Sequence, residues 1–241
     1  MTIQRITLTG ADERTQIEDL AYLLDNFPEV EIGLLYTATP EGRQRYPSRN
    51  WLATAVSALS GRVALHICGR GARRELLGGF LSDLTRHAPR VQVNGRLEVA
   101  EVEVLARLVG TLITQHNAAN ASLTQAVALN HALLVDSSGG RGVSPDAWLA
   151  PETDKVVGFA GGLGPDNIQV EYPRIERVAK PGAWLDMEGK LRVNDWFNLA
   201  MAHRCAHLFR ESHFPQTHLA GGSAPECTEV ANDRPPAFRR L

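Results

Sequence analysis

Residues 133–142 of the 241-residue chain read Leu-Leu-Val-Asp-Ser-Ser-Gly-Gly-Arg-Gly, and residues 156–167 read Val-Val-Gly-Phe-Ala-Gly-Gly-Leu-Gly-Pro-Asp-Asn. Each stretch is a short apolar run that ends in a glycine-rich turn. Such a run predicts a parallel strand that is buried on both faces. The small residues that follow let the backbone approach a ligand. Because the first run ends on a carboxylate, Asp136, we expect the C-terminal ends of these strands to carry the chemistry.

Strand and helix signals alternate eight times along the chain. The expected strands are residues 4–9, 30–36, 62–68, 90–94, 110–115, 131–136, 156–160 and 183–187. Amphipathic stretches lie between them, typical of helices that cover a sheet. Eight such units favour a closed barrel over an open sheet, so we predict an α/β protein with a single (β/α)8 TIM barrel. The barrel is expected to span residues 1–212, and residues 213–241, which have no sustained period, are expected to form an irregular C-terminal tail.

Proline and Asx residues indicate where helices begin. We expect helix starts at Ser144-Pro145 and Gly164-Pro165, and a cap at Asn194-Asp195 for the last helix. No GxGxxG follows the first strand and no GxxxxGK[ST] occurs in the chain. The usual dinucleotide and nucleoside-triphosphate motifs are therefore absent from the sequence.

Composition and charge narrow the class of protein. A formal net charge of -2 argues against general nucleic-acid binding and against a polybasic membrane surface. No apolar run approaches the ~18 residues that span a bilayer, and the N-terminus shows no secretory signal. The three cysteines are widely spaced without a CxxC, which suggests neither a disulfide framework nor a zinc site. We expect a reduced, soluble, cytoplasmic protein that needs no cofactor and no metal, with its oligomeric state left open.

In barrels of this kind the active site is built from the loops that follow the strands. The polar residues at the expected strand ends are Thr9, Tyr36, His66, Cys68, Gln92, Asn94, Gln115, His116, Asp136, Asp186 and Glu188. Asp136 is the strongest candidate, because an apolar residue would serve packing better at the end of that run. His66 and His116 are the imidazoles at strand ends, and either can titrate near neutral pH.

Four segments match the motifs of one family. Residues 160–167 match a Ser-Gly-Gly-Leu-x-Pro-Glu-Asn phosphate loop, and Gly139-Gly140-Arg141-Gly142 matches Gly-Gly-Ser-Gly. Residues 43–48 match Ser-Lys-Arg-Tyr-Ile-Ser, and residues 91–95 match Val-Gln-Leu-His-Gly. Over most of residues 4–200 the chain thus resembles phosphoribosylanthranilate isomerase, a (β/α)8 barrel of tryptophan biosynthesis.

The resemblance implies roles for individual residues. Asp136 falls on the general acid, and Arg45 falls on the arginine that contacts the substrate carboxylate. A phosphate would lie at Gly161 and Gly162. The other residues that the resemblance places around a small phosphorylated or anionic substrate are Gln92, Asn94, Gly140, Gly142 and Glu188.

The chain departs from the family at two positions that touch the chemistry. Thr7-Leu8-Thr9-Gly10 stands where the family has Lys-Ile-Cys-Gly, so Thr9 replaces the cysteine that acts as general base. A hydroxyl is too weak a base without an activating neighbour. The family's last turn, Asp-Val-Ser-Ser-Gly-Val-Glu, becomes Asp186-Met187-Glu188-Gly189-Lys190-Leu191-Arg192. Glu188 would repel a phosphate unless Lys190 or Arg192 folds back to neutralise it.

Three functions remain open. The first is an isomerase of the aldose–ketose type with Asp136 as acid, Thr9 at the base position and His66 or His116 as an alternative base. The second is a non-catalytic barrel that serves as a binding or assembly module. The third is a lyase or hydrolase that uses Asp136, Asp186 and Glu188 around a divalent cation. Stabilisation by phosphate or by a divalent cation would separate these functions.

Overall fold

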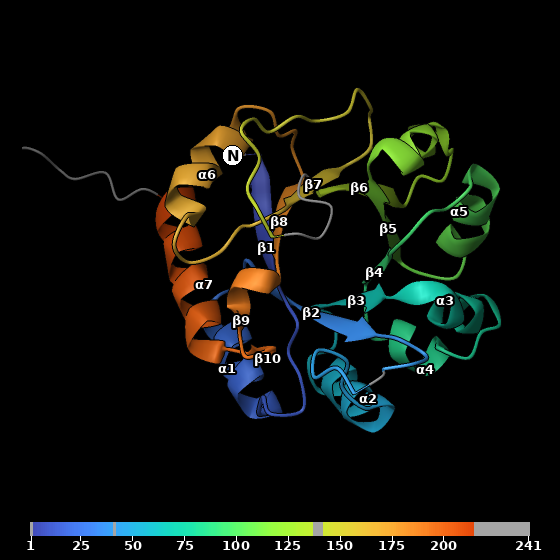
Figure 1. The fold of residues 1–241 in the computed structure, drawn as a ribbon, viewed down its shortest axis with the longest axis horizontal. Coiled ribbons are helices and arrows are strands. Elements are labelled where there is room, and N and C mark those ends of the chain that lie inside the picture. The colour runs from blue at the N-terminus through green and yellow to red at the C-terminus, as the bar shows by residue number, and fades with distance from the viewer. Residues whose placement is uncertain (1, 41, 137–141, 215–241) are drawn as a thin grey trace, which may run out of the picture.

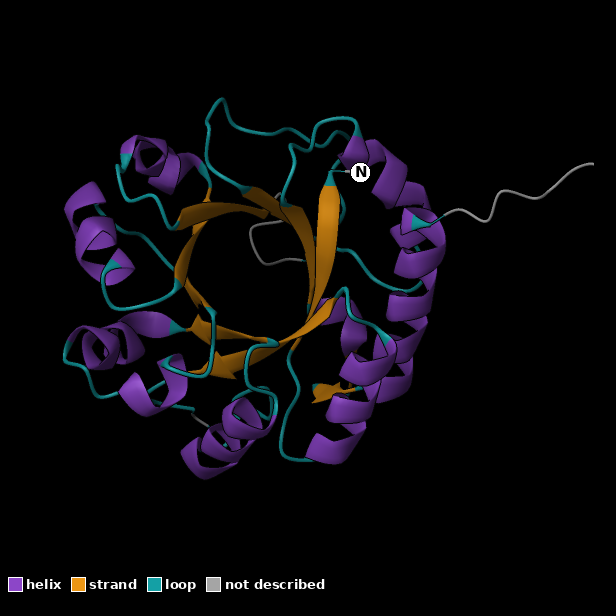
Figure 2. Cartoon of the chain, turned by 180° about the vertical axis from the view of Figure 1, so that it is seen from behind, coloured by secondary structure: helices purple, strands orange, loops and turns teal. Residues whose placement is uncertain are grey.

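The computed structural model describes residues 2–40, 42–136 and 142–214. Eight parallel strands close into a barrel in the order of the sequence, β1 to β8, as the ring in Figure 2 shows. The strands are β1 (Ile3–Thr9), β2 (Val30–Tyr36), β3 (Val63–Ile67), β4 (Arg90–Val93), β5 (Thr111–His116), β6 (His131–Asp136), β7 (Val157–Ala160) and β8 (Ala183–Met187). The prediction of a single (β/α)8 barrel is confirmed, and every expected strand is found within one residue of its predicted bounds.

Helices surround most of the barrel (Figure 1). The α-helices are α1 (Ile17–Asn26), α2 (Arg49–Ala58), α3 (Gly69–Leu77), α4 (Ser82–Thr85), α5 (Val99–Ala106), α6 (Ile168–Glu176) and α7 (Leu199–His213). The 3₁₀ helices are η1 (Ala118–Gln125) and η2 (Gly189–Leu191). The short strands β9 (Arg192–Val193) and β10 (Trp196–Phe197) form a hairpin between η2 and α7. No helix in the described part of the chain is long and apolar enough to cross a membrane.

The helix start predicted at Ser144-Pro145 is wrong. Residues 142–156 connect to β7 as an irregular loop. Pro145 and Pro151 each remove a backbone donor within this short stretch, which disfavours a helix. The loop is held instead by Trp148, whose Nε1 donates to Glu171 Oε2 of α6 at 2.7 Å.

The two other predicted helix starts are also displaced. α6 begins at Ile168 rather than at Pro165, because the Asn167 side chain first closes a turn by accepting from the Gly164 N–H at 2.9 Å. The cap of α7 is Asn198, whose side chain accepts from the Met201 N–H at 3.0 Å. Asn194 and Asp195 have φ angles of 52° and 63° and form the turn of the β9–β10 hairpin.

The core has two parts. The larger part lies between the strands and the surrounding helices, and it contains most of the buried apolar side chains. A small apolar group fills the inside of the barrel, and it consists of Ile113, Ala132, Leu134 and Trp184. Because side chains alternate along a strand, residues two positions apart face the same side. Residues at the starts of the strands therefore line one end of the barrel interior, and residues at the ends of the same strands line the other.

Candidate active site

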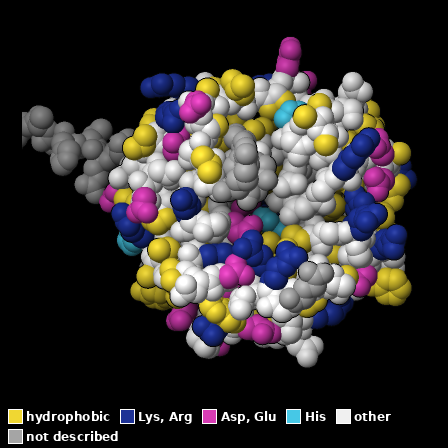
Figure 3. Space-filling model, in the orientation of Figure 1, with side chains coloured by type: hydrophobic (Ala, Val, Ile, Leu, Met, Phe, Trp, Pro, Cys, Tyr) yellow, Lys and Arg dark blue, Asp and Glu magenta, His cyan; other side chains and the backbone are white. Residues whose placement is uncertain are grey.

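A cavity of about 280 Å³ opens at the C-terminal ends of the strands. Seven of the strands, β2 to β8, or the loops that follow them contribute to its lining. In Figure 3 acidic and histidine side chains are visible in a hollow at the centre of one face, with Lys and Arg side chains along its edge. Of the residues predicted from the sequence, the cavity brings together Arg45, Gln92, Asn94, Asp136, Gly142, Gly161, Gly162 and Glu188.

Three predicted residues are placed differently. Thr9 lies under the cavity, fully buried. His116 is not among the lining residues, whereas its neighbour Gln115 is. Strand alternation explains this difference, because adjacent residues point to opposite faces of the barrel wall. Gly140 lies outside the described residues.

Thr9, Asp186 and His66 form a buried group at the floor of the cavity. The Thr9 hydroxyl donates to Asp186 Oδ1 at 2.9 Å, and His66 Nε2 lies 3.6 Å from Asp186 Oδ2. Gly33 makes room for this arrangement, because a Cβ at position 33 would lie 2.1 Å from Thr9 Oγ1. The position that the family resemblance assigns to a base therefore holds a hydrogen-bond donor to a carboxyl group.

Burial sets the protonation of this group. Burial raises the pKa of Asp186 to about 7, and the nearby Glu31 and Asp136 charges act in the same direction, while the Thr9 hydrogen bond opposes them. Burial lowers the pKa of His66 to about 4, so its imidazole is neutral at pH 7. Asp186 can therefore gain or lose a proton near neutral pH, as an acid–base catalyst must.

Sequence reasoning underrated Asp186. The sequence places it among the polar residues at the strand ends and gives it a role only in the divalent-cation alternative. The available signal was its place in the run Trp184-Leu185-Asp186-Met187, where a carboxyl group stands between apolar residues. That pattern does not reveal how completely the side chain is buried.

Asp136 and Asp186 stand at the same height in the barrel wall. Asp136 pairs with Ala160 of β7, and Ala160 pairs with Asp186 of β8. One strand separates the two carboxyl residues, so their Cα atoms are about 10 Å apart, given about 4.8 Å between neighbouring strands. The small side chain of Ala160 leaves space between them, and all three residues line the cavity.

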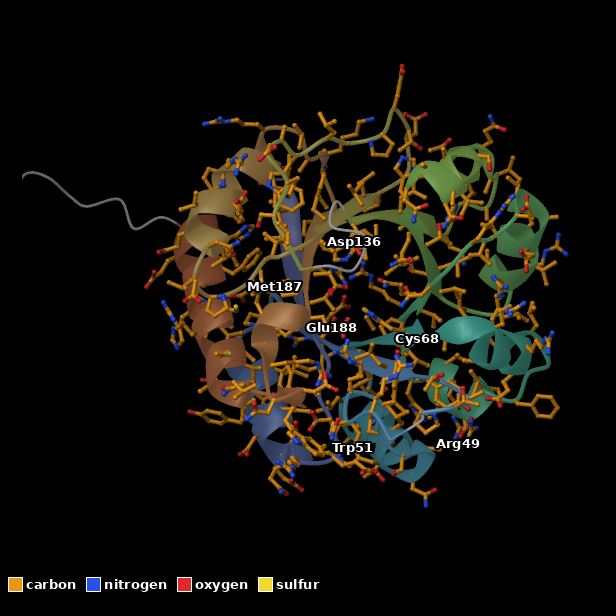
Figure 4. All side chains as sticks on the ribbon, in the orientation of Figure 1. Arg49, Trp51, Cys68, Asp136, Met187 and Glu188 are labelled. Atoms are coloured by element: carbon orange, nitrogen blue, oxygen red, sulfur yellow. The ribbon has the colours of Figure 1, made fainter. Side chains whose placement is uncertain are left out.

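Arg45 holds two carboxylates at the rim. Its Nη1 donates to Glu188 Oε1 at 3.0 Å, and its Nη2 donates to Asp195 Oδ1 of the β9–β10 hairpin at 2.6 Å. Figure 4 shows Glu188 near the centre of the barrel, below Asp136 and to the left of Cys68 in that view. Burial raises the pKa of Glu188, and the Arg45 charge opposes that shift.

From the sequence, Glu188 would repel a phosphate unless Lys190 or Arg192 folded back to neutralise it. The direct ion pair is instead made by Arg45, from the loop after β2. Arg192 contributes a weaker attraction and is itself 3.5 Å from Asp12 Oδ2. Its Nη2 also donates to the Gly10 carbonyl at 2.7 Å.

A chain of polar contacts lines another part of the cavity wall. Gln92 Nε2 donates to Asn94 Oδ1 at 2.8 Å, and Asn94 Nδ2 lies 3.3 Å from Cys68 Sγ. Burial raises the pKa of the Cys68 thiol to about 11. The thiol in this cavity is therefore protonated at neutral pH and does not replace the cysteine base of the family.

The turn after β7 provides backbone groups for an anion. Gly161 and Gly162 have φ angles of 121° and 66°, a region that suits glycine. Asn167 ties the turn together, with its Nδ2 donating to the Gly162 carbonyl at 2.9 Å. Lys190 packs beside the turn, because a Cβ placed on Gly164 would lie 2.3 Å from the Cβ of Lys190. Lys190 and both glycines line the cavity, so a positive charge and small residues meet at this side.

No group of three or more His, Cys, Asp or Glu side chains in the described part of the chain has the arrangement of a metal site. Asp136, Asp186 and Glu188 share the cavity without forming such a group.

Comparisons with known proteins bear on the fold. No protein-family model matches the chain, and no curated protein matches it in sequence. A phosphoribosylanthranilate isomerase from Thermus thermophilus superposes with a TM-score of 0.62 at 19% identity, covering 86% of this chain and 98% of that one. TrpF from Jonesia denitrificans gives a TM-score of 0.62 at 14% identity, covering 88% and 100%.

A third solved structure is a phosphoribosylanthranilate isomerase in complex with reduced 1-(o-carboxyphenylamino)-1-deoxyribulose 5-phosphate. It has a TM-score of 0.60 at 16% identity, and the match covers 86% of this chain and 97% of that one. At this level of identity the likeness establishes the fold alone. The resemblance noted in the sequence is confirmed at that level: the chain has the (β/α)8 barrel fold of the phosphoribosylanthranilate isomerases, in a diverged form.

Proposed function

We propose that the cavity at the C-terminal end of the barrel binds a phosphorylated sugar or a similar small anion and isomerises it by proton transfer. The observation that carries this proposal is the pair Asp136 and Asp186, which face one cavity at the same height on either side of Ala160. Two carboxyl groups in unlike environments are a common acid–base pair.

The two carboxyl groups take different roles. Asp136 donates a proton to the ring oxygen of the cyclic sugar, which breaks the bond between C1 and that oxygen. Asp186, as the carboxylate, removes the proton from C2, and the electron pair of that C–H bond forms a C1–C2 double bond. Asp186 then returns its proton to C1, the C2 hydroxyl gives its proton to the Asp136 carboxylate, and the C2 carbonyl of the ketose forms with both groups restored. Thr9 orients Asp186 through its hydrogen bond. The Thr9 hydroxyl is itself too weak a base, so its part is to position the carboxylate that removes the proton.

The anionic end of the substrate lies at the turn after β7. The backbone around Gly161 and Gly162 and the Lys190 ammonium group suit a phosphate. Support also comes from the similar barrel whose bound ligand carries a 5-phosphate. Gln92, Asn94 and Gly142 line the same cavity.

The other end of the substrate differs from an anthranilate. Arg45 is paired with Glu188 and Asp195, so a substrate carboxylate must displace one of them. We expect little turnover of N-(5-phosphoribosyl)anthranilate for this reason, and because Thr9 stands at the position of the cysteine base.

The test follows proton exchange at carbon. The wild-type protein is incubated in D2O with a panel of aldose phosphates, starting with ribose 5-phosphate, and the C2 proton is followed by NMR. Inorganic phosphate and ribose 5-phosphate are expected to raise the melting temperature. Asp136→Asn is expected to keep that stabilisation and to stop formation of the ketose, because an amide cannot donate the required proton.

Two outcomes would count against the proposal. Ketose formation that survives Asp136→Asn would mean that the acid is another group. If phosphates stabilise the protein but no member of the panel exchanges its C2 proton, a binding module is favoured instead. The two ion pairs of Arg45 also support that function.

A further inference from the structure

A second and larger cavity, of about 960 Å³, opens at the opposite end of the barrel, where the strands begin. Among the residues that the structure describes, its lining shares none with the cavity described above. Residues from β1, β4, β5, β6 and β8 form its inner end, and the loops 124–130 and 152–156 form its sides. In TIM barrels this end serves stability, so a cavity of this size there needs an explanation.

The inner end carries more positive than negative charge. Arg5 and Arg90 share one carboxylate, Glu31, with Arg90 in direct contact and Arg5 Nη1 at 3.7 Å from Glu31 Oε2. The Arg90 side chain is 8% exposed, and its guanidinium group lies 4.1 Å from the centre of the Trp184 ring. The buried Arg90 charge is thus paired with Glu31, and the half-exposed Arg5 adds a second positive charge at this end of the cavity.

Trp184 adds a donor that lacks an acceptor. Its side chain is 1% exposed and lines the cavity. Its Nε1 has no hydrogen-bond partner among the described residues, and the same holds for Nδ1 of His131, also in the lining. An indole N–H can only donate, and so can a guanidinium group. A ligand that satisfies them must therefore bring acceptor atoms, and an anionic group would also balance the charge.

The sides of the cavity are apolar in part, and the charged residues Glu152, Asp154 and Lys155 line them as well. Ala126, Val127, Ala128, Leu129 and Val156 line it, and the Val127 and Leu129 side chains are largely exposed to solvent. This side of the barrel is covered by less α-helix than the rest, because a 3₁₀ helix follows β5 and residues 142–156 form a loop. Apolar side chains around a group of polar donors are typical of sites for small organic ligands.

We propose that the N-terminal end of the barrel binds a small organic anion that carries an apolar group. Arg5, Arg90 and the Trp184 N–H hold the acidic group, and the loops 124–130 and 152–156 contact the apolar part. This site is separate from the proposed isomerase site, and neither proposal depends on the other.

The test uses benzoate and phenylphosphonate as probes, with benzamide as the neutral counterpart of benzoate. Binding to the full chain is measured by isothermal titration and by the shift in melting temperature. We expect saturable binding of at least one anion, and at least tenfold weaker binding of benzamide. Comparison of the two anions shows whether the site prefers a planar carboxylate or a tetrahedral acid.

Matched variants locate the probe. Arg5→Met removes one guanidinium group and leaves Arg90 with Glu31, and Arg5 is 44% exposed, so the fold should tolerate the change. Arg45→Met is the control, because Arg45 is similarly exposed, at 37%, and lines the other cavity. We expect Arg5→Met to weaken binding at least tenfold, Trp184→Phe to weaken it several-fold, and Arg45→Met to leave it unchanged.

Three results would overturn the proposal. They are the absence of saturable binding by either anion, equal binding of benzoate and benzamide, and a loss of binding that follows Arg45→Met rather than Arg5→Met. The last result would assign the probe to the C-terminal cavity. Circular dichroism of each variant identifies any loss of binding that comes from unfolding.

Discussion

The two ends of the barrel are built by the same strands but carry different side chains. Along β8, Trp184 belongs to the N-terminal cavity, and Asp186 and Glu188 belong to the C-terminal one. Along β4, Arg90 lies at the first end, and Gln92 and Asn94 lie at the second. A spacing of two residues keeps these side chains inside the barrel, so the step from Trp184 to Asp186 on β8, or from Arg90 to Gln92 on β4, leads from one cavity to the other.

The difference shows how buried charges at one end affect the other. The Arg90 charge lowers the pKa of Asp186, whereas the Glu31 charge raises it, and burial exceeds both effects. Glu31 and Arg90 satisfy each other, while Asp186 has a neutral hydroxyl and a neutral imidazole as its neighbours. The Arg90 and Glu31 charges at the N-terminal end are therefore paired with each other, whereas Asp186 at the C-terminal end can gain or lose a proton near pH 7. Four predictions test this contrast, in order of decreasing effect.

The largest expected effect is on turnover. Asp186→Asn should lower ketose formation by about 10²–10⁴-fold, the usual contribution of one acid–base group. Phosphate stabilisation should persist in this variant. Asp154→Asn, at the rim of the N-terminal cavity, is the matched control and should retain full activity.

The same prediction extends to pH, because a pH profile of turnover separates a base from a merely structural residue. Wild-type turnover should rise as Asp186 ionises around its pKa of about 7. Thr9→Val removes a hydrogen bond that lowers this pKa, so the rise should move to higher pH. An unchanged profile in Thr9→Val would contradict the role of Asp186.

The second prediction concerns stability against pH. Asp186 has a folded pKa of about 7 against an ordinary value of 3.8, so between these values the folded state holds a proton that the unfolded state has lost. Asp186 therefore destabilises the fold increasingly as pH rises from about 4 to 7. The slope is about 1.4 kcal/mol per pH unit, which amounts to about 4 kcal/mol in all.

His66 acts with the opposite sign over part of this range. Its folded pKa is about 4 against 6.5, so the stability that comes from its neutral state is lost as pH falls from 6.5 towards 4. The measurement is therefore the difference in unfolding free energy between Asp186→Asn and wild type at each pH. That difference cancels the His66 contribution and should increase from pH 4 to 7. A constant difference would show that Asp186 is ionised throughout.

The third prediction tests the turn after β7. Gly162→Leu and Gly79→Leu both put a side chain on a backbone with positive φ, at 66° and 77°. A Cβ at position 162 would lie 2.4 Å from the Ser144 backbone N, whereas nothing lies within 4 Å of one at position 79. Gly162→Leu should cost about 1–3 kcal/mol more in unfolding free energy, and it alone should abolish stabilisation by phosphate. Phosphate stabilisation that persists in Gly162→Leu would place the anion elsewhere.

The smallest expected effect is at the rim. Asp195→Asn removes one partner of Arg45 in a pair whose side chains are 37% and 32% exposed. Such pairs contribute at most about 1 kcal/mol to stability. The variant should therefore melt close to wild type, while its affinity for the carboxylate of anthranilate should rise because Arg45 is partly released. Equal affinity for anthranilate in both proteins would show that Glu188 alone keeps Arg45 occupied.

Much of the fold and part of the candidate site could be predicted from local patterns. The strands follow from apolar runs, and eight repeats of strand and helix imply closure. Because parallel strands end together, Asp136 and the Gly161-Gly162 turn were expected at one mouth, and both line its cavity. The helix start at Ser144-Pro145 failed because proline at a predicted first turn suits an irregular loop equally well.

The sequence by itself determined the barrel, the mouth that carries the candidate site and the presence of Asp136 there, since these depend on periodicity and on strand direction. Only the tertiary structure decided which residues meet inside. Thr9 and Asp186 are 177 residues apart, and Arg45 and Glu188 are 143 apart, so closure of the barrel brings each pair together. Closure also removes water from Asp186 and so moves its pKa towards 7. Desolvation depends on everything that surrounds a side chain, and for that reason no local pattern in the sequence reveals it.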